Sequence, residues 1–304
     1  MADIVGIGSN VYDTLMVLPH FPQEDTKMRI EKIIKCGGGP CGTGLVAAAK
    51  LGAKCAYIGN LAEDEGGRFL LQDMERFSMD NRFVNCINGY RSFLSFVLLN
   101  RDKGTRTCIA DRGDLPELAL TEQQKQAVRD AQILMVDGNE LPAAVEGAKI
   151  ASKSGTRVLY DAGGLYDNIE QLLPYSDILI PSEEFALGHT GEKTVQKAAE
   201  KLFALYRPEI VVITQGAKGG IFFDGKEIRQ YPSFPVEVVD SNGAGDAFHG
   251  AFAFALTKGF SCEQCCLFAS AVSAVKCTHM GAREGIPNYS ETITFLKERG
   301  RNEF

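Results

Sequence analysis

Short apolar runs rich in β-branched residues alternate with amphipathic stretches along the whole 304-residue chain. A run that is apolar at every position suits a strand buried on both faces, as in a parallel sheet covered by helices. We therefore predict an α/β fold with a mostly parallel sheet between two layers of helices. The predicted strands are Ile4–Ile7, Cys55–Ile58, Ile133–Val136, Arg157–Tyr160, Ile178–Ile180, Ile210–Thr214 and Gly220–Phe223. The helical patterns include Gly44–Leu51, Gly67–Phe77, Leu141–Ser154, Val195–Leu205 and Asp246–Thr257.

Two segments, residues 14–36 and 89–110, depart from this alternation. The second contains the apolar stretch Ser92–Leu99 and then a charged stretch from Arg101 to Arg106, a pattern typical of antiparallel strands joined by a polar turn. We expect the two segments to form a small β lid inserted into the sheet domain. No repeat and no Pro/Ser-rich linker divides the chain, so we predict one domain over residues 1–304.

Composition excludes several classes of protein. The chain has 32 Lys and Arg against 39 Asp and Glu, a net charge of −7 without a basic cluster, so a nucleic-acid partner is not expected. No stretch approaches the roughly 18 consecutive apolar residues of a membrane helix. The amino-terminal residues carry no targeting pattern. We therefore expect a cytoplasmic protein with no membrane partner.

The nine cysteines are odd in number and scattered along the chain. In a chain of this size they are expected to be reduced thiols that act as small buried hydrophobic residues. Cys262 and Cys265 have a CxxC spacing, which leaves a zinc site as the alternative. No second CxxC or paired histidine follows, and Ser261–Lys276 is apolar at helical spacing, so a structural role is favoured.

The strongest functional signal is the segment Val238–Ala251, in which an apolar run passes through Gly243, Ala244 and Gly245 into a predicted helix. Small residues at a helix start leave backbone amides accessible to an anion such as a phosphate. Asp246 follows in the first helical turn. Helix capping is the alternative for an isolated aspartate, but capping needs no glycines, so we favour a functional carboxylate.

Two further glycine clusters stand beside predicted strands and helices. Thr214–Gly220 follows a strand and offers a hydroxyl, a flexible backbone and Lys218 to the phosphates of a nucleotide. A simple hairpin turn would have the same sequence pattern, so it remains the alternative. Cys36–Gly44 precedes a helix and has amides suited to a polyol, with a tight packing turn equally compatible.

Other chemistries find little support in the sequence. There is no GxxxxGK[ST] motif for a P-loop. Gly6 and Gly8 follow the first strand, but the third glycine of a dinucleotide-binding fingerprint is missing, so a nicotinamide-dependent oxidoreductase is a weak alternative. The four histidines have no ligand spacing, and no GxSxG motif occurs.

These residues resemble the ribokinase-like (PfkB) carbohydrate kinases over essentially the whole chain. The resemblance rests on Gly8–Asp13, Gly37-Gly38, Ile58–Asn60, Asp64–Gly67, Thr214–Gly219, Asp240–Ala251 and Gly281–Pro287. It implies a three-layer α/β/α domain with a small β lid, and transfer of the γ-phosphoryl group of ATP to a hydroxymethyl group of a sugar. ATP and Mg²⁺ are the implied cofactors, with K⁺ in some members. It also implies a homodimer formed through the lid.

The resemblance assigns roles to individual residues. It makes Asp246 the base, with Gly243, Ala244 and Gly245 as the anion hole. The implied nucleotide residues are Thr214, Gly216, Lys218, Gly219 and Ser270. The implied sugar residues include Asp13, Gly38 and Gly39. The positions that hold a monovalent cation in some members, mostly through backbone carbonyls, are Asp240, Asn242, Lys276, His279, Gly281 and Gly285.

The sequence departs from the family pattern at several of these places. The asparagine usual after the Gly-Gly block is Gly42, and a substrate-contacting glutamate of ribokinases is Gly138. The Asn-x-x-Glu motif near magnesium and the phosphates reads Ser182–Phe185, so Glu183 is the candidate for a water-mediated metal contact.

Some segments are more similar to the branch that contains sulfofructose kinase. There Asn139 replaces the arginine expected for an anionic substrate, while the basic lid residue Lys27 is kept. A sulfofructose or sugar-phosphate kinase is therefore one alternative. A non-catalytic sugar- or nucleotide-binding protein of the same fold is another, favoured by the altered Ser182–Phe185 motif and opposed by the intact Asp246.

Overall fold

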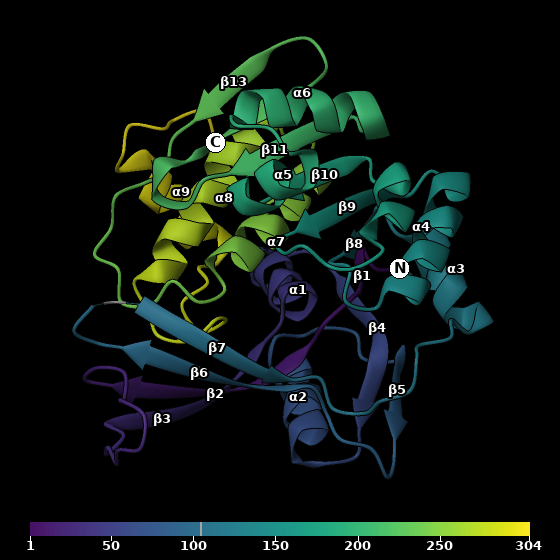
Figure 1. Cartoon of the computed structure of the whole chain (residues 1–304). Coiled ribbons are helices and arrows are strands. Elements are labelled where there is room, and N and C mark those ends of the chain that lie inside the picture. The colour runs from purple at the N-terminus through teal and green to yellow at the C-terminus, as the bar shows by residue number, and fades with distance from the viewer. Residues whose placement is uncertain (104) are drawn as a thin grey trace.

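The computed structural model describes residues 1–103 and 105–304, and its main body is a nine-stranded sheet (Figure 1). The strand order is β13-β12-β11-β10-β9-β8-β1-β4-β5, and neighbours are parallel from β11 to β5. The last two strands, β12 and β13, are antiparallel. The bounds are β1 Ile4–Ile7, β4 Cys55–Ala62, β5 Val84–Ile87, β8 Ile133–Val136, β9 Arg157–Ala162, β10 Ile178–Pro181, β11 Ile210–Thr214, β12 Gly220–Phe223 and β13 Ile228–Tyr231.

Helices cover both faces of this sheet, so the predicted three-layer fold is confirmed. One core packs α1, α2, α7, α8 and α9 against one face, and a second core packs α3 to α6 against the other. The bounds are α1 Pro40–Leu51, α2 Glu65–Arg76, α3 Glu122–Asp130, α4 Leu141–Ser154, α5 Glu183–Thr190, α6 Val195–Tyr206, α7 Ala244–Thr257, α8 Cys262–Cys277 and α9 Tyr289–Lys297. Short 3₁₀ turns occupy Ile169–Gln171, Leu173–Tyr175 and Gly216–Lys218.

The continuous apolar runs follow from this double burial. Along β8, Ile133 and Met135 enter one core, whereas Leu134 and Val136 enter the other. Successive side chains of a strand point to opposite faces, so both faces need apolar residues. The edge strands β5 and β13 were not predicted, because their sequences VNCI and IRQY mix polar and apolar residues.

The lid is a separate four-stranded sheet with the order β3-β2-β6-β7. Its strands are β2 Val11–Leu18, β3 Lys32–Gly38, β6 Leu94–Asn100 and β7 Thr105–Asp111. The two hairpins are antiparallel, but β2 and β6 run parallel, which the sequence did not reveal. Leu15, Val17, Val97 and Leu99 form its small buried core.

Helix α1 begins earlier than predicted, at Pro40 instead of Gly44. Gly39 is its N-cap residue with a φ of 83°, a conformation that glycine adopts without strain. A side chain at Gly39 would also meet the carbonyl of Ser9. Proline at the first helical position costs no hydrogen bond, so the glycine block ends where the helix starts.

All nine cysteines are thiols, and the CxxC pair lies on α8 with Cys265 buried and Cys262 half-buried. Within residues 1–103 and 105–304, no helix combines the length and apolar character needed to cross a bilayer.

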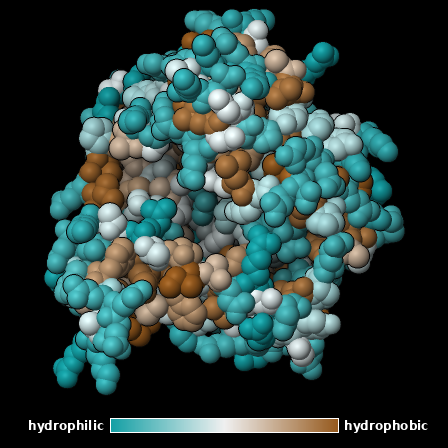
Figure 2. All heavy atoms as spheres, viewed as in Figure 1, coloured by the Kyte–Doolittle hydropathy of each residue, from teal (hydrophilic) through white to brown (hydrophobic). Residues whose placement is uncertain are grey.

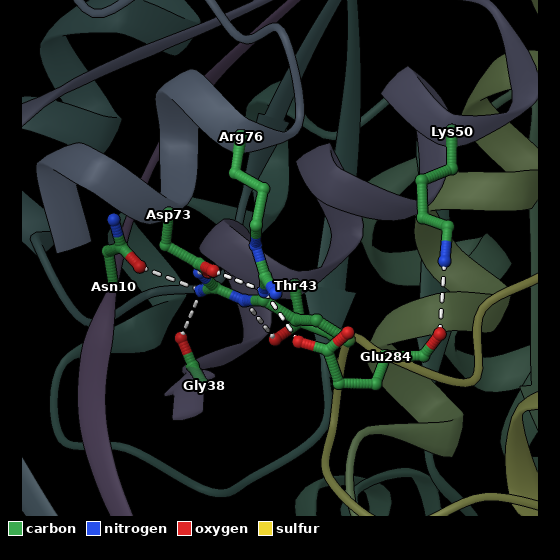
Figure 3. A network of polar contacts seen from close by, with 8 residues as sticks. Asn10, Gly38, Thr43, Lys50, Asp73, Arg76 and Glu284 are labelled. Atoms are coloured by element: carbon green, nitrogen blue, oxygen red, sulfur yellow. Dashed lines mark hydrogen bonds and ion pairs between the residues drawn. The ribbon is translucent and has the colours of Figure 1, made fainter. Parts of the chain in front are cut away.

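A buried polar network ties the carboxyl-terminal segment to the base of the lid (Figure 3). The guanidinium of Arg283, 1% exposed, forms a 2.6 Å ion pair with Asp73 on α2. It also donates to the carbonyl of Gly38, at 2.6 Å, and to Oδ1 of Asn10, at 2.7 Å. One residue thus fixes the start of β2 and the end of β3 against α2.

We predict that Asp73→Ala lowers the free energy of unfolding by about 3–5 kcal/mol, because it leaves the buried Arg283 charge without its partner. Chemical denaturation at neutral pH measures this change. Arg82→Ala is the matched control, since it removes an ion pair to Asp80 in which the arginine side chain is 73% exposed and exposed pairs contribute little. A loss no larger than that of the control would show that the network does not stabilise the fold.

Candidate active site

The candidate site lies where the carboxyl ends of the central strands face the lid, the edge at which open α/β sheets bind ligands. Figure 2 shows that the surface is hollowed between the main body and the small sheet. The lid reaches across this hollow, because Nη1 of Arg106 on β7 donates to Oγ of Ser241 at 2.8 Å. The site is therefore enclosed by both sheets.

The residues of the predicted anion hole lie at the amino terminus of α7. Gly243 is the N-cap residue with a φ of 75°, and a side chain there would collide with Ala282. Gly245 is exposed, with open space where a Cβ atom would stand. The amides of this first turn and the dipole of a 14-residue helix are thus presented to the hollow.

Asp246 stands in the same turn, half-buried and near three other carboxylates. Burial and the charges of Asp161, Asp137 and Asp13 raise its pKa to about 7, while His249 acts in the opposite direction. A carboxylate with a pKa near neutrality is suited to accept a proton at physiological pH. This environment fits a general base better than a helix cap.

His249 connects this turn to the sheet. Its Nδ1 lies 2.6 Å from the carbonyl of Gly245, and its Nε2 lies 3.0 Å from the carbonyl of Ile180. Nδ1 is also 3.1 Å from Oδ2 of Asp161, without hydrogen-bond geometry. Burial lowers the pKa of His249, whereas the two carbonyls and Asp246 oppose that shift. The ring holds the Gly245–Asp246 peptide in place.

Asp137, at the end of β8, joins the first glycine loop to the sheet. Its carboxylate accepts from the amide and hydroxyl of Ser9, at 2.8 and 2.7 Å, and from the amides of Cys41 and Asn139, at 3.0 and 2.9 Å. A side chain at Gly8 would meet this carboxylate at 2.5 Å. Gly8 is therefore a packing requirement and not part of a dinucleotide fingerprint.

Asp13 lies on β2 at the inner face of the lid, and it is buried. Ser95 on β6 donates to its Oδ1 at 2.7 Å. Burial raises the pKa of Asp13 to about 6, against the effects of Ser95, Arg283 and Asn242. A side chain at Gly38 would collide with Oδ2 of Asp13. Asp13, Gly38 and Asn242 are therefore neighbours, and the lid carboxylate adjoins the loop that leads to Asp246.

A cavity of about 430 Å³ extends from the anion hole along α7 and α8. The predicted residues that line it are Thr214, Gly216, Gly219, Ala244, Gly245 and Ser270. Phe234, Val236 and Phe248 supply apolar walls, which suits a flat ring system at the far end. Thr214–Gly220 is also the antiparallel turn between β11 and β12, so the hairpin interpretation is confirmed and the nucleotide contact stays a prediction.

Lys218 does not join this cavity. It is exposed and, with Gln215, lines a neighbouring cavity on the other side of the turn. The reason is the 3₁₀ turn Gly216–Lys218, which directs successive residues around its axis. The backbone glycines of the loop, and not its lysine, face the candidate nucleotide space.

Ser182 and Glu183 stand at the start of α5, beside β11. Ser182 Oγ accepts from the amide of Phe185 at 3.1 Å, so it caps the helix. Glu183 is half-buried and accepts a 2.8 Å bond from Nε2 of Gln215. Carboxylate oxygen is the donor type that Mg²⁺ prefers, so Glu183 fits a metal contact, whereas Ser182 has a structural use.

A second cavity, of about 230 Å³, lies at the ends of β1 and β4 beneath the loop after β7. Asn139 lines it and accepts a 2.7 Å bond from Arg112. Asn10 also lines it; its Nδ2 is buried without a partner in the described part of the chain. Burial raises the pKa of Glu140 on the same wall to about 7. The pocket thus presents donors, one cation and a titrating carboxyl.

The structure places two of the predicted sugar residues, Gly42 and Lys27, outside the linings of the cavities described above, so their sugar contacts stay predictions. A side chain at Gly42 would stand 2.5 Å from both Arg283 Nη2 and Asn10 Oδ1, and its amide donates to Ser9. Because Gly42 has no side chain, Arg283 and Asn10 can occupy the space beside it. Lys27 is exposed in the loop between β2 and β3 and lines none of the three cavities described above. Arg112 is the basic lid-side residue that faces a pocket.

The six positions associated with a monovalent cation come together between the ends of α8 and the loop before α7, but they do not fit one. Nζ of the fully buried Lys276 donates to the carbonyl of Asp240 at 2.7 Å. The carbonyl of Lys276 accepts from the amide of His279, and a side chain at Gly285 would meet that carbonyl at 2.8 Å. Oxygens needed as ligands already hold N–H donors.

Several site residues were missed by the sequence analysis. Asp137 and Asp161 sit at or near the ends of β8 and β9, and the rule that ligands bind at the carboxyl edge could have identified them. His249 and Arg283 lay inside quoted motifs without a role. Arg106 and Arg112 had no signal beyond their charge, because only the folded lid brings them to the site.

Comparison with known proteins agrees with this arrangement. The family described as pfkB family carbohydrate kinase matches residues 1–288. A ribokinase from Haemophilus influenzae is 27% identical, over 96% of this chain and 97% of its own length. A 5-dehydro-2-deoxygluconokinase from Shouchella clausii is 23% identical, over 98% and 96%. The structure of Arabidopsis thaliana ribokinase complexed with ribose and ATP matches with a TM-score of 0.87 at 27% identity, over 97% and 99% of the two chains.

The architecture is thus the ribokinase-like α/β/α fold with a small lid sheet. The chain belongs to the pfkB family of carbohydrate kinases, as the resemblance of its motifs predicted. Family membership leaves the oxidoreductase alternative without support.

Proposed function

We propose that this protein transfers the γ-phosphoryl group of ATP to a hydroxymethyl group of a sugar or sugar derivative. The observation that carries the proposal is the position of Asp246, whose carboxyl has a pKa of about 7. It directly follows the exposed amides at the start of α7. The 430 Å³ cavity lies on one side of it and the lid residue Asp13 on the other. An in-line phosphoryl transfer requires a base, hydrogen-bond donors for the phosphoryl oxygens, and adjacent binding sites for the nucleotide and the acceptor.

ATP occupies the larger cavity in this proposal. The apolar walls near Phe234 and Val236 hold the base beside Ser270, and the Thr214–Gly219 loop lies along the phosphates. The γ-phosphoryl group then reaches the amides of Gly243–Gly245, where the dipole of α7 favours negative charge. The Arabidopsis relative complexed with ribose and ATP supports this placement.

Asp246 removes the proton from the attacking hydroxyl. The hydroxyl oxygen forms a bond to the γ-phosphorus while the bond from that phosphorus to the β-phosphate oxygen breaks, giving a sugar phosphate and ADP. The anion-hole amides bind the equatorial oxygens during the transfer. Arg106, held at Ser241, brings a positive charge from the lid to the same loop.

Mg²⁺ neutralises the triphosphate when it is bound. It is held mainly by phosphates and waters, with one or two carboxylates from the protein. Glu183 is the residue we assign to this contact, since its carboxylate lies near the Thr214 loop through its bond to Gln215.

The sugar lies between Asp13 and Asp246. Asp13 accepts hydroxyl hydrogen bonds, and the carbonyl and amide groups near Gly38 and Gly39 lie beside it. The smaller cavity with Asn10, Asn139 and Arg112 extends the site outward. A cation there favours acceptors that carry an acidic group, so sulfofructose and sugar phosphates remain the alternative substrates.

A coupled assay of ADP release against neutral sugars, sugar acids, sulfonated sugars and sugar phosphates tests the proposal. We expect at least one sugar to stimulate ADP release well above the rate with ATP alone. Sugar or ATP binding detected by calorimetry without turnover on any member of the panel would instead favour the non-catalytic alternative.

We predict that Asp246→Asn lowers turnover by about 10²- to 10⁴-fold with little change in ATP affinity. The wild-type kcat/KM should fall below pH 7, because the base is protonated as the pH drops through its pKa of about 7. A pH profile of the free enzyme checks the midpoint. A variant that keeps near-normal turnover would remove Asp246 from the mechanism.

The same substitution should raise the melting temperature at pH 8 more than at pH 5. The pKa of this carboxyl is raised from 3.8 to about 7 in the fold, so its destabilising effect grows as the pH rises between these two values and is complete only above about 7. At pH 5 the carboxyl is largely neutral, as an amide is. Differential scanning fluorimetry at the two pH values measures the contrast, and equal shifts would contradict the raised pKa.

We predict that Asp13→Ala raises the KM for the sugar strongly and the KM for ATP little. Arg112→Met should raise the KM only for acceptors with an acidic group. Lys27→Met is the matched control, because Lys27 is exposed outside the pockets. Equal effects of Asp13→Ala on both KM values, or a larger effect of Lys27→Met than of Arg112→Met on an acidic acceptor, would contradict these assignments.

The lid also supports the proposed homodimer. Its outer face exposes Ile33, Phe96 and Ile109, each more than 40% exposed, on the side opposite the buried lid core. Every residue of the edge strand β7 is exposed, so its backbone can pair with a second copy. An apolar sheet face with an open edge is typical of such an interface.

We predict that Phe96→Glu converts a dimer into a monomer, because it places a charge in the centre of this face. Size-exclusion chromatography with light scattering gives the mass. Leu205→Glu is the control, since Leu205 is also an exposed apolar residue, 57% against 42% for Phe96, but lies on α6 away from the lid. A wild-type chain that is monomeric at micromolar concentration would refute the dimer.

A further inference from the structure

Lys276 is a buried lysine in the last turn of α8, and its side chain is 0% exposed. Lysine is almost never fully buried unless its charge is compensated. Here Nζ donates to the backbone carbonyl of Asp240 at 2.7 Å. Burial lowers the pKa of Lys276, while Asp240 and Asp246 act to raise it, so both carboxylates are close enough to interact with the ammonium group.

The carboxylate of Asp240 is also fully engaged. Oδ1 accepts from the amide of Asn242 at 2.8 Å, and Oδ2 accepts from the amide of Gly281 at 2.9 Å. The amides of Val239 and Asp240 in turn donate to the carbonyl of Cys277. Lys276 is thus the positive charge at the centre of a hydrogen-bond network that joins the end of α8 to the loop preceding the anion hole.

That loop leads directly into the catalytic turn. Asp240 stands three residues before Gly243, whose carbonyl accepts the first helical bond of α7. Fixing the Asp240 carbonyl therefore restrains the approach to the Gly243–Gly245 amides. Because buried charges are weakly screened, the ammonium also adds a positive field beneath the site where phosphate charge develops.

An exchangeable monovalent cation would have to occupy the same place. It would need the Asp240 carbonyl oxygen, which already accepts from Nζ, and it would lie beside a like charge in a region that excludes water. The positions that suggested a cation loop in the sequence are therefore present in space but unsuited to a cation.

We propose that the Lys276 ammonium is a permanent, covalently attached substitute for a monovalent cation, and that this kinase works independently of potassium. The inference rests on the proposed kinase function, because it concerns how the anion hole of that reaction is held. It goes further in naming the residue that replaces the ion and in predicting the ion response of the enzyme.

The first test compares KCl with tetramethylammonium chloride at a matched ionic strength of about 0.1 M, so that screening is equal. We expect the wild-type rate on its best acceptor to differ by less than about twofold, and the melting temperature to be the same, since no ion binds specifically. Potassium-specific activation or potassium-specific stabilisation of the wild-type protein overturns the proposal.

The second test removes the ammonium. Lys276→Ala should lower turnover by about 100-fold in tetramethylammonium, the loss typical of an electrostatic stabiliser, and KCl should restore part of it. KCl should also raise the melting temperature of the variant but not that of wild type. Full activity of Lys276→Ala in tetramethylammonium would overturn the proposal. Lys197→Ala, an exposed lysine on α6, is the control that should respond like wild type.

Two provisions keep the result interpretable. If Lys276→Ala does not fold, Lys276→Gln retains an N–H donor for the Asp240 carbonyl without the charge, and the same loss of turnover is expected. The melting-temperature readout needs no turnover, so it tests the cation proposal even if no acceptor is found and the kinase function itself fails.

Discussion

Four carboxylates crowd the carboxyl edge of the sheet, and the surrounding structure serves to keep them there. Asp137, Asp161, Asp246 and Asp13 come from four different elements. Burial raises the pKa of the last three, and repulsion from other members of the group adds to the rise at Asp161 and Asp246. Like charges in a weakly polar volume resist ionisation. The four hydrogen bonds to Asp137 and the ring of His249 beside Asp161 offset part of this repulsion. Asp246 is left with a pKa near that needed for proton transfer.

The carboxyl-terminal segment supplies two buried cations to the same region. Arg283 pairs with Asp73 and holds the floor of the lid, and Lys276 holds the loop before the anion hole. The family pattern predicts a different group at each place. Arg283 lies where the asparagine expected at position 42 would be, and Lys276 lies near Asp240, where an ion would be expected. The glycine at position 42 makes the first of these possible, since a side chain there would enter the space that the Arg283 guanidinium uses.

The sequence predicted the layers, the lid and the motif around Asp246, because these depend on local patterns. Apolar runs at every position mark strands buried on both faces, and bare amides before an aspartate mark a helix start. The sequence did not predict the parallel pairing of β2 with β6, or that Arg106 and Arg112 lie at the site. Both depend on contacts between distant segments, for which the sequence carries no periodic signal. The sequence also did not show that Lys218 lines a different cavity from the loop glycines, since the direction of a side chain in a tight turn is set by backbone geometry. The edge strands β5 and β13 lack the double burial that makes a strand recognisable.

The parallel pairing of β2 with β6 limits how the lid can move. The chain enters the small sheet at Val11 and leaves it after Gly38. It then forms α1, β4, α2 and β5 before it returns to the small sheet at Leu94. The lid is therefore attached to the main body by four chain connections, whereas a simple inserted loop would have two. Four connections restrain the small sheet more than two would, so it cannot swing freely on one linker. A lid from another protein can be transplanted only if both of its hairpins are moved together.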